Sequence, residues 1–309
     1  MTQKIFVALS TFAEHGDEPA RVLRDSGHEI ACNPHGRRLT ADEVVSLAAD
    51  CAGIIAGVEP YTSGVLSALP KLRCISRVGA GLDNVDLEAA RERGVAIRNT
   101  PDVVTDAVAE LTLGMVLDLL KNLSIHTAEM KRGEWIKHTG RMLRGKRVGV
   151  IGLGRIGKRV AENFVALGAS VHGADPAADP EWAKRTGVAV EPVSEVVRSA
   201  DVLCLHLSGS VGEFRLGAPE ISGMKTGAIL VNVSRGRFVD EHALYEALAA
   251  GKLAGAALDV YSEEPYAGRL CELGNVVLTP HIATLTAETR VAMELEAVEN
   301  ILDSLERTG

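Results

Sequence analysis

Three glycines in the middle of the chain have the spacing of a phosphate-binding loop. Gly152-Leu153-Gly154-Arg155-Ile156-Gly157 fits the pattern G-x-G-x-x-G, which by itself also arises by chance. Its setting adds weight, because the apolar run Arg147–Ile151 ends at the first glycine and a helical pattern begins at the third. Glycines let the backbone approach a pyrophosphate, whose charge is stabilised by N–H groups at a helix N-terminus. The sequence therefore predicts a dinucleotide site.

An acidic residue stands where a dinucleotide site needs one. Asp175 follows the next apolar run, Ser170–Gly173, at about 20 residues beyond Gly152, the spacing at which a carboxylate accepts hydrogen bonds from an adenosine ribose. A carboxylate there repels a 2′-phosphate, and residues 176–179 offer no Arg or Lys to bind one. The expected cofactor is therefore NAD and not NADP.

Three further polar residues each follow an apolar run, at the sheet edge where open parallel sheets bind ligands. They are Arg235 after Ala228–Val231, Glu264 after Ala256–Leu258, and His281 after Val276–Leu278. A histidine can move a proton near neutral pH, a carboxylate can orient its ring, and an arginine can bind a carboxylate through two donors. Each also has a structural explanation as a surface turn, a solvated Glu before Pro, or a hydrogen-bonded strand end.

The elements that would position these residues form a regular alternation. Short apolar runs alternate with helical patterns along the chain, which predicts α/β structure with helices on both faces of parallel sheets. We expect two doubly wound domains: a flavodoxin-like substrate domain of residues 1–99 and 283–309, and a Rossmann NAD-binding domain of residues 100–282. The stretch from Asp102 to Arg132 is one of the longest helical stretches and contains no strand, and Ala287–Leu305 reads as a terminal helix returning to the first domain.

The composition narrows the class of protein. The 309 residues are 46% hydrophobic and 24% charged, with a net charge of −8, which excludes disordered and collagen-like chains. The acidic balance argues against nucleic acid or an anionic membrane as the main partner. No signal peptide is apparent at the N-terminus, so a cytoplasmic location is expected. No Cys-x-x-Cys is present, and we interpret the cysteines as reduced core thiols without a metal role: Cys32, Cys51, Cys74, Cys204 and Cys271.

Several ordered motifs together resemble the D-2-hydroxyacid dehydrogenase family, and within it the phosphoglycerate dehydrogenase-like branch. The resemblance covers nearly the whole chain. Its motifs are Asn33-Pro34-His35-Gly36-Arg37-Arg38-Leu39, the segment Arg77–Asp86, Asn99-Thr100-Pro101, the glycine loop, and Pro280-His281.

This resemblance implies a role for each candidate residue. Arg235 would bind the carboxylate and keto oxygen of the substrate, His281 would be the acid/base, and Glu264 would pair with the imidazole. The resemblance also places Val78, Gly79 and Ala80 at the substrate carboxylate, and Arg77, beside this loop, is a further candidate for substrate binding. The cofactor-binding set, with Asp259 at the nicotinamide carboxamide, is Gly152, Gly154, Arg155, Ile156, Gly157, Asp175, His206, Ser208, Val233, Ser234 and Asp259.

The chain departs from the family pattern after His206. Ser208 and Glu213 stand where relatives usually have Pro and Thr, which predicts a more flexible and more acidic cover over the cofactor. The residues after His281 suffice for a closing helix, so the regulatory domain of long phosphoglycerate dehydrogenases is not expected. Relatives dimerise through the region of the apolar stretch Val103–Leu123, and we expect a homodimer.

The substrate and the function class stay open at this stage. Arg37, Arg38 and Arg77 could bind the phosphate or phosphonate of a substrate such as 3-phosphoglycerate, or they could be solvated. Glyoxylate, hydroxypyruvate and other small keto acids are alternatives. So are two different functions on the same fold: a non-catalytic NAD-sensing corepressor-like protein, and a dehydrogenase of phosphite or formate.

Asp175 generates a prediction about cofactor choice. NADH should be preferred over NADPH by at least about tenfold in kcat/KM, because the carboxylate accepts from ribose hydroxyls and repels a 2′-phosphate. Asp175→Ala should shrink that ratio. Steady-state rates with both cofactors check this, and equal use of both by the native protein would refute the ribose assignment.

Overall fold

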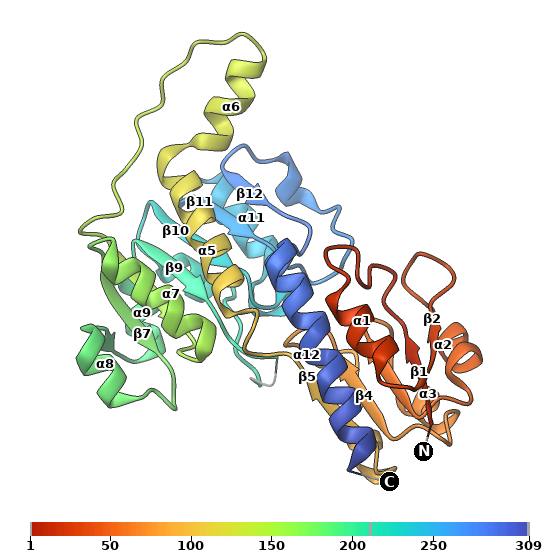
Figure 1. The fold of residues 1–309 in the computed structure, drawn as a ribbon. Helices are drawn as coiled ribbons and strands as arrows, with labels where there is room; N and C mark the ends of the chain where they lie inside the picture. Colours follow the sequence, from red (N-terminus) through yellow and green to blue (C-terminus); the bar gives the residue numbers. More distant parts are fainter. Residues whose placement is uncertain (1, 210–211, 308–309) are drawn as a thin grey trace. The chain divides into compact units, whose positions relative to one another are not determined.

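The protein was analysed as a computed structural model that describes residues 2–209 and 212–307, and it folds into two compact α/β units. One unit runs to Val104 and resumes at Thr284, and the other is Thr105–Ala283. The sequence placed these boundaries after residues 99 and 282. Each unit is built on one parallel sheet, so the predicted α/β class with two doubly wound sheets is confirmed (Figure 1).

The first unit has a five-stranded sheet in the order β2-β1-β3-β4-β5. This is the flavodoxin-like order, in which the chain winds outward from β1 in both directions. Its strands are β1 Lys4–Val7, β2 Glu29–Cys32, β3 Gly53–Ala56, β4 Cys74–Arg77 and β5 Ala96–Asn99. Its helices are α1 Glu18–Asp25, α2 Ala41–Ala48, α3 Ser63–Ser67, α4 Leu87–Glu92 and the terminal α12 Ala287–Glu306.

Helix α12 returns to the first unit, as the sequence predicted. It packs against α1 and against strands β3, β4 and β5. Gly53 allows this close approach, because a Cβ there would stand 2.9 Å from Cγ1 of Ile301. The contact buries Ile301 completely and joins the end of the chain to the middle of the sheet.

The second unit has a seven-stranded sheet in the order β12-β11-β10-β9-β6-β7-β8. Its strands are β6 Arg147–Ile151, β7 Ser170–Ala174, β8 Ala189–Val190, β9 Val202–Leu205, β10 Ala228–Asn232, β11 Leu253–Leu258 and β12 Val276–Leu278. Its helices are α5 Thr105–Lys121, α6 Leu123–Lys131, α7 Arg155–Ala166, α8 Pro180–Thr186, α9 Val193–Ser199, α10 Ala218–Gly223 and α11 Glu241–Ala249, with short 3-10 helices at Gly236–Phe238 and Arg269–Glu272. Residues 210 and 211 of the loop after His206 lie outside the described residues.

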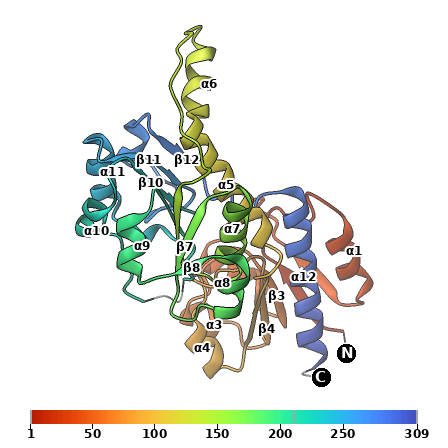
Figure 2. The same cartoon turned by 90° about the vertical axis from the view of Figure 1, so that its left-hand side faces the viewer.

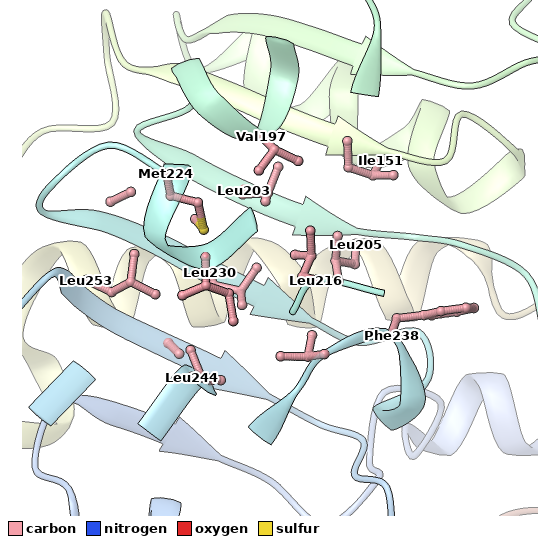
Figure 3. Close-up of a cluster of buried hydrophobic side chains, with 14 of the residues drawn as sticks. Ile151, Val197, Leu203, Leu205, Leu216, Met224, Leu230, Phe238, Leu244 and Leu253 are labelled. Carbon is pink, nitrogen blue, oxygen red and sulfur yellow. The ribbon is translucent and has the colours of Figure 1, made fainter. Parts of the chain in front are cut away.

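Strand β9 lies beside β6, the strand that ends at the glycine loop, in the centre of this sheet. The winding direction of the chain reverses between these two strands. Side chains of β9 and β10 meet those of α9, α10 and α11 in one buried cluster, part of which is drawn in Figure 3. Leu203, Leu205 and Leu230 lie at its centre and are fully buried. This cluster fixes the strands whose carboxyl ends carry the candidate residues.

The helical stretch from Asp102 to Arg132 is interrupted. Asn122 adopts a left-handed conformation with φ of 54°, which ends α5 and starts α6 in a new direction. Asn tolerates this conformation better than most residues because its short polar side chain can bond locally. Asp118 accepts hydrogen bonds from the N–H and the hydroxyl of Ser124 across the break. The predicted helical stretch without a strand therefore consists of two helices, and the sequence did not indicate the break between them.

The two resulting helices differ in their surroundings. Helix α5 packs against α7 and against strands β10, β11 and β12, and its apolar face is buried within its own unit. Helix α6 buries none of its side chains, and it projects from the sheet with the extended segment that follows (Figure 2). The sequence analysis expected the apolar stretch Val103–Leu123 to contribute to a dimer interface. The exposed large apolar side chains lie mainly at Leu123 and in the segment that follows it.

Two sequence interpretations of the cysteines and helices need revision. Cys32 and Cys271 are exposed, so they are not core thiols, although all five cysteines are free.

Helix α7 begins at Arg155 with Gly154 at its N-cap position, whereas the glycine pattern suggested a start at Gly157. Among the described residues, no helix has the length and apolar character required to cross a membrane.

Candidate active site

The glycine loop joins β6 to α7, and the absence of a side chain has a different structural consequence at each of its three glycines. A Cβ on Gly152 would stand 2.5 Å from the carbonyl oxygen of His206, and one on Gly157 would stand 1.8 Å from the carbonyl oxygen of Gly152. Both positions therefore exclude a larger residue. Gly154 is exposed and has open space around its Cβ position, so the N-terminus of α7 is accessible to a ligand. Arg155 and Ile156 form the first turn of this helix.

Asp175 holds the same loop from the end of β7. One carboxylate oxygen accepts a hydrogen bond from the N–H of Leu153 at 2.7 Å, and the other accepts from the N–H of Ala177 at 2.8 Å. Each carboxylate oxygen has two lone pairs, so both can accept a further bond from a ribose hydroxyl. The carboxylate thus shapes the glycine loop and keeps acceptor capacity for a ligand.

His206 lies beside the glycine loop with an unsatisfied ring nitrogen. Its Nε2 is buried and has no hydrogen-bond partner among the described residues. Its Cβ lies 3.5 Å from the position of a Cβ on Gly157. Burial lowers the pKa of His206 to about 3, so the ring is neutral near pH 7. Buried polar groups without a partner are rare, and one at this loop fits a bound polar ligand.

Together these observations test whether the loop fits a dinucleotide. The glycines leave the backbone of the loop uncovered by side chains, and the N-terminus of α7 is accessible. The carboxylate of Asp175 lies at the end of the neighbouring strand β7. The residues present therefore fit NAD. Ser208 is exposed on the loop after His206, and Val233 and Ser234 are buried after β10.

The three candidate catalytic residues follow three neighbouring strands, β10, β11 and β12. His281 Nδ1 lies 3.0 Å from Glu264 Oε2, and both side chains are partly exposed, at 52% and 38%. The other carboxylate oxygen of Glu264 accepts from the N–H of Tyr261 at 3.1 Å. The structure therefore brings His281 and Glu264 together, and the ring nitrogen left for a reactant is Nε2.

Arg235 is positioned by a buried asparagine that the sequence interpretation missed. Asn232 Oδ1 accepts from the N–H and the hydroxyl of Ser234, and its amide group donates to the carbonyl oxygen of Arg235 at 2.8 Å. Arg235 Nη1 in turn donates to the carbonyl oxygen of Ser234 at 2.7 Å. These bonds close a tight turn around the arginine. An Asn at the end of an apolar run was the available signal.

Gly236 brings that turn against the loop that carries Glu264. A Cβ on Gly236 would stand 1.9 Å from the carbonyl carbon of Tyr261 and 2.3 Å from the N of Ser262. The side chain of Tyr261 is anchored by its hydroxyl, which donates toward the carbonyl oxygens of Leu258 and Thr279. Backbone contact at Gly236 thus sets the spacing between the Arg235 and Glu264 loops.

Asp259 is bonded to the segment that carries His281. Its side chain is fully buried at the end of β11. One oxygen accepts from the Thr279 hydroxyl at 2.6 Å and from the N–H of Ile282 at 2.8 Å, and the other accepts from the N–H of Ala283 at 2.9 Å. The carboxylate thus positions the histidine through the residues that flank it.

The expected substrate-binding residues lie in the first unit, at the end of β4 and directly after it. The N–H of Val78 donates to the carbonyl oxygen of Ala56 at 2.8 Å, and the N–H of Gly79 donates to the Thr100 hydroxyl at 2.7 Å. Both donors are therefore used within the protein. Arg77 folds over Gly79, because its Nη1 lies 1.5 Å from the position of a Cβ there.

The chain is similar in sequence to one family of known proteins. Residues 113–283 match the NAD binding domain of the D-isomer specific 2-hydroxyacid dehydrogenases. The chain is 40% identical over 292 residues to D-3-phosphoglycerate dehydrogenase of Methanocaldococcus jannaschii, covering 92% of this chain and 55% of that protein. It is 37% identical over 262 residues to hydroxypyruvate reductase of Thermotoga maritima, covering 82% of this chain and 84% of that protein.

A solved structure is similar along the whole chain. D-lactate dehydrogenase from Aquifex aeolicus, complexed with NAD and lactic acid, matches with a TM-score of 0.86 at 27% identity, over 98% of this chain and 95% of that one. The chain spans about half the length of the phosphoglycerate dehydrogenases that it matches.

The contacts of Asp259 generate a prediction. Asp259→Asn replaces one acceptor oxygen by an amide group that faces a backbone N–H, so at least one buried bond is lost. We expect a loss of about 1–3 kcal/mol in the free energy of unfolding and a fall in kcat. Urea titration and initial rates check this, with the exposed Asp25→Asn as the matched control. Native unfolding and native kcat in the Asp259 variant would show that the carboxylate does not hold the histidine.

Proposed function

Because the chain belongs to the D-isomer specific 2-hydroxyacid dehydrogenase family, as its motifs predicted, we propose that it interconverts a D-2-hydroxy acid and its 2-keto acid with NAD. The observation that carries this proposal is the 3.0 Å contact between His281 and Glu264 at the carboxyl ends of strands β11 and β12. Arg235 follows the adjacent strand β10. The names of the relatives support the class of substrate: phosphoglycerate dehydrogenase, hydroxypyruvate reductase and D-lactate dehydrogenase.

Each residue has a defined task in this proposal. NADH, when bound, supplies the hydride that reduces the keto carbon. His281 donates a proton from Nε2 to the carbonyl oxygen, and it takes the proton back in the oxidation direction. Glu264 accepts a hydrogen bond from the N–H at Nδ1, which fixes the orientation of the ring and stabilises its charged form. Arg235 stabilises the negative charge on the carboxylate and on the keto oxygen through its planar guanidinium.

The cofactor assignment rests on the loop that precedes α7. We assign the pyrophosphate to the backbone of residues 152–157 and the adenosine ribose to Asp175, since a bare backbone and a carboxylate are the groups that bind them. His206 would meet the cofactor as a neutral ring, because burial lowers its pKa to about 3. A positive imidazolium is thus not required for cofactor binding.

The two other functions on this fold make different demands. A non-catalytic NAD sensor would need no acid/base pair, so the contact between His281 and Glu264 favours catalysis over sensing. A panel of substrates distinguishes a phosphite or formate dehydrogenase from a 2-hydroxyacid dehydrogenase. NADH consumption is measured with glyoxylate, hydroxypyruvate, phosphohydroxypyruvate and phosphonopyruvate, and NAD reduction is measured with phosphite and formate.

The proposed acid/base role of His281 generates the next prediction. His281→Ala should lower kcat for keto-acid reduction by roughly 10² to 10⁴, because the proton donor is lost. The affinity for NADH, measured by fluorescence titration, should change little. A folded variant that binds NADH and keeps a near-native kcat would contradict the mechanism.

Glu264→Gln is the companion variant. Keto-acid reduction needs the imidazolium, which loses its carboxylate partner, so the alkaline limb of the pH–rate profile should move to lower pH. A purely structural Glu264 would alter stability and leave that limb in place.

We also propose a cytoplasmic location and a small-molecule ligand, which the free cysteines and the net charge support. All five cysteines are free, which supports a reducing, cytoplasmic environment. The net charge of −8 supports a small-molecule ligand and not nucleic acid.

We further propose that the projecting segment 123–142 forms a homodimer. Several large apolar side chains on this short segment are exposed although it belongs to a well-packed unit, and such an excess of exposed apolar surface supports an interface. They are Leu123, Met130, Trp135, Ile136 and Met142, of which Trp135 is 77% exposed. The segment is tied together by His138, whose Nε2 lies 2.8 Å from Glu129 Oε1.

This assignment predicts the oligomeric state. Light scattering should give twice the mass of the chain at micromolar concentration, and Trp135→Glu should shift the protein toward monomer. Val193→Glu, which places the same charge on an exposed apolar site of α9, should leave the mass unchanged. A monomeric native protein at micromolar concentration would refute the proposal.

A further inference from the structure

The loop after β3, residues 57–62, lies beside the expected substrate loop in the first unit. Strands β3 and β4 are parallel neighbours in which Ala56 pairs with Arg77. The N–H of Val78 donates to the carbonyl oxygen of Ala56 at 2.8 Å, so the two strands separate only after this bond. Because adjacent strands are about 4.8 Å apart, groups at Gly57 and Val78 are close neighbours.

This loop contains a buried carboxylate that the proposed mechanism does not use. Glu59 is only 3% exposed. Its Oε2 accepts from the N–H of Gly57 at 2.8 Å and from the Tyr61 hydroxyl at 3.4 Å. The side chain is therefore folded back onto the end of β3, and the carboxylate lies next to the strand that leads to Val78.

The position of Glu59 is fixed by its neighbours. Asn84 donates from its side-chain amide to the carbonyl oxygens of Gly57 and Glu59, at 3.2 and 2.7 Å. The backbone of Tyr61 bonds to Asn84 and Asp86 on the other side. Burial and the nearby carboxylate raise the pKa of the Tyr61 hydroxyl, which keeps it protonated as a donor. The negative charge thus has little freedom to move away from an anion.

The loops nearest to Glu59 are acidic. The segments after β1, β3, β4 and β5 (residues 8–17, 57–62, 78–86 and 100–104) contain six carboxylates and no Lys or Arg: Glu14, Asp17, Glu59, Asp83, Asp86 and Asp102. Arg77, the last residue of β4, lies over Gly79. The loop after the edge strand β2 carries two further cations: Arg37, which is paired with Glu43 at 2.6 Å, and the exposed Arg38. The loops that flank Glu59 on β1, β4 and β5 are therefore acidic, with Arg77 as the cation at the end of β4.

We propose that Glu59 determines substrate specificity, by excluding 2-keto acids that bear a phosphate or another anionic group on the third carbon. The preferred substrates are then short and carry one carboxylate, as hydroxypyruvate and glyoxylate do. The carboxylate of the substrate offsets the charge of Arg77, whereas a phosphate adds about −1.5 to −2 charges beside a buried carboxylate. Like charges placed together are a strong means of rejecting a ligand. This inference rests on the proposed function.

The experiment compares hydroxypyruvate with phosphohydroxypyruvate in NADH oxidation by the full chain. The native protein should favour hydroxypyruvate by about 100-fold in kcat/KM. Glu59→Gln keeps an acceptor for the N–H of Gly57 and removes the charge. It should narrow the preference by at least about fivefold, through a lower KM for the phosphorylated acid. Glu88→Gln removes a charge from the exposed face of α4 and should leave the preference unchanged.

Two results would overturn this inference alone: a native protein that prefers phosphohydroxypyruvate, or a Glu59→Gln preference equal to that of Glu88→Gln. The native ratio decides the first without any variant, so the inference stays testable if Glu59→Gln does not fold. No NADH oxidation with either acid, or with any acid of the panel, would overturn the proposed function and this inference with it.

Discussion

The buried carboxylate of Asp259 constrains the conformation on which the candidate active site depends. His281 has a φ of 56°, a left-handed conformation that non-glycine residues rarely adopt. Such a conformation persists only where its surroundings hold it in place. Bonds from Thr279, Ile282 and Ala283 to Asp259 supply this support on both sides of the histidine. With the backbone fixed, the ring can meet Glu264 through Nδ1 and leave Nε2 for a reactant.

Carboxylates perform the same structural task at other strand ends of both units. Asp175 accepts from the N–H of Leu153 in the glycine loop, and Glu59 accepts from the N–H of Gly57 after β3. In each case an acidic side chain holds a loop at the carboxyl end of a parallel strand, and in the roles proposed for Asp175 and Glu59 it also sets the charge that a ligand meets. Loop geometry and electrostatic selectivity therefore come from the same atoms, and a substitution that removes the charge also tests the loop.

Much of the fold could be predicted because apolar runs and helical patterns alternate without ambiguity. The sequence indicated the strands Arg147–Ile151 and Val276–Leu278 with the observed limits. It missed β2 and β8, whose short runs are less apolar, and the break at Asn122, since an asparagine inside an apolar helical pattern is a weak stop. The contact of His281 with Glu264 came from the family resemblance. The roles of Asn232 and Asp259 depend on bonds between segments far apart in sequence, which periodicity does not encode.

The central claim is that this chain moves a hydride between a nicotinamide cofactor and the second carbon of a 2-hydroxy acid of D configuration. The most direct measurement uses NADH carrying deuterium in the transferred position, with hydroxypyruvate as the acceptor and chiral separation coupled to mass spectrometry of the product. The expected product is D-glycerate with one deuterium on the second carbon. Glycerate without deuterium, or glycerate of L configuration, would contradict it.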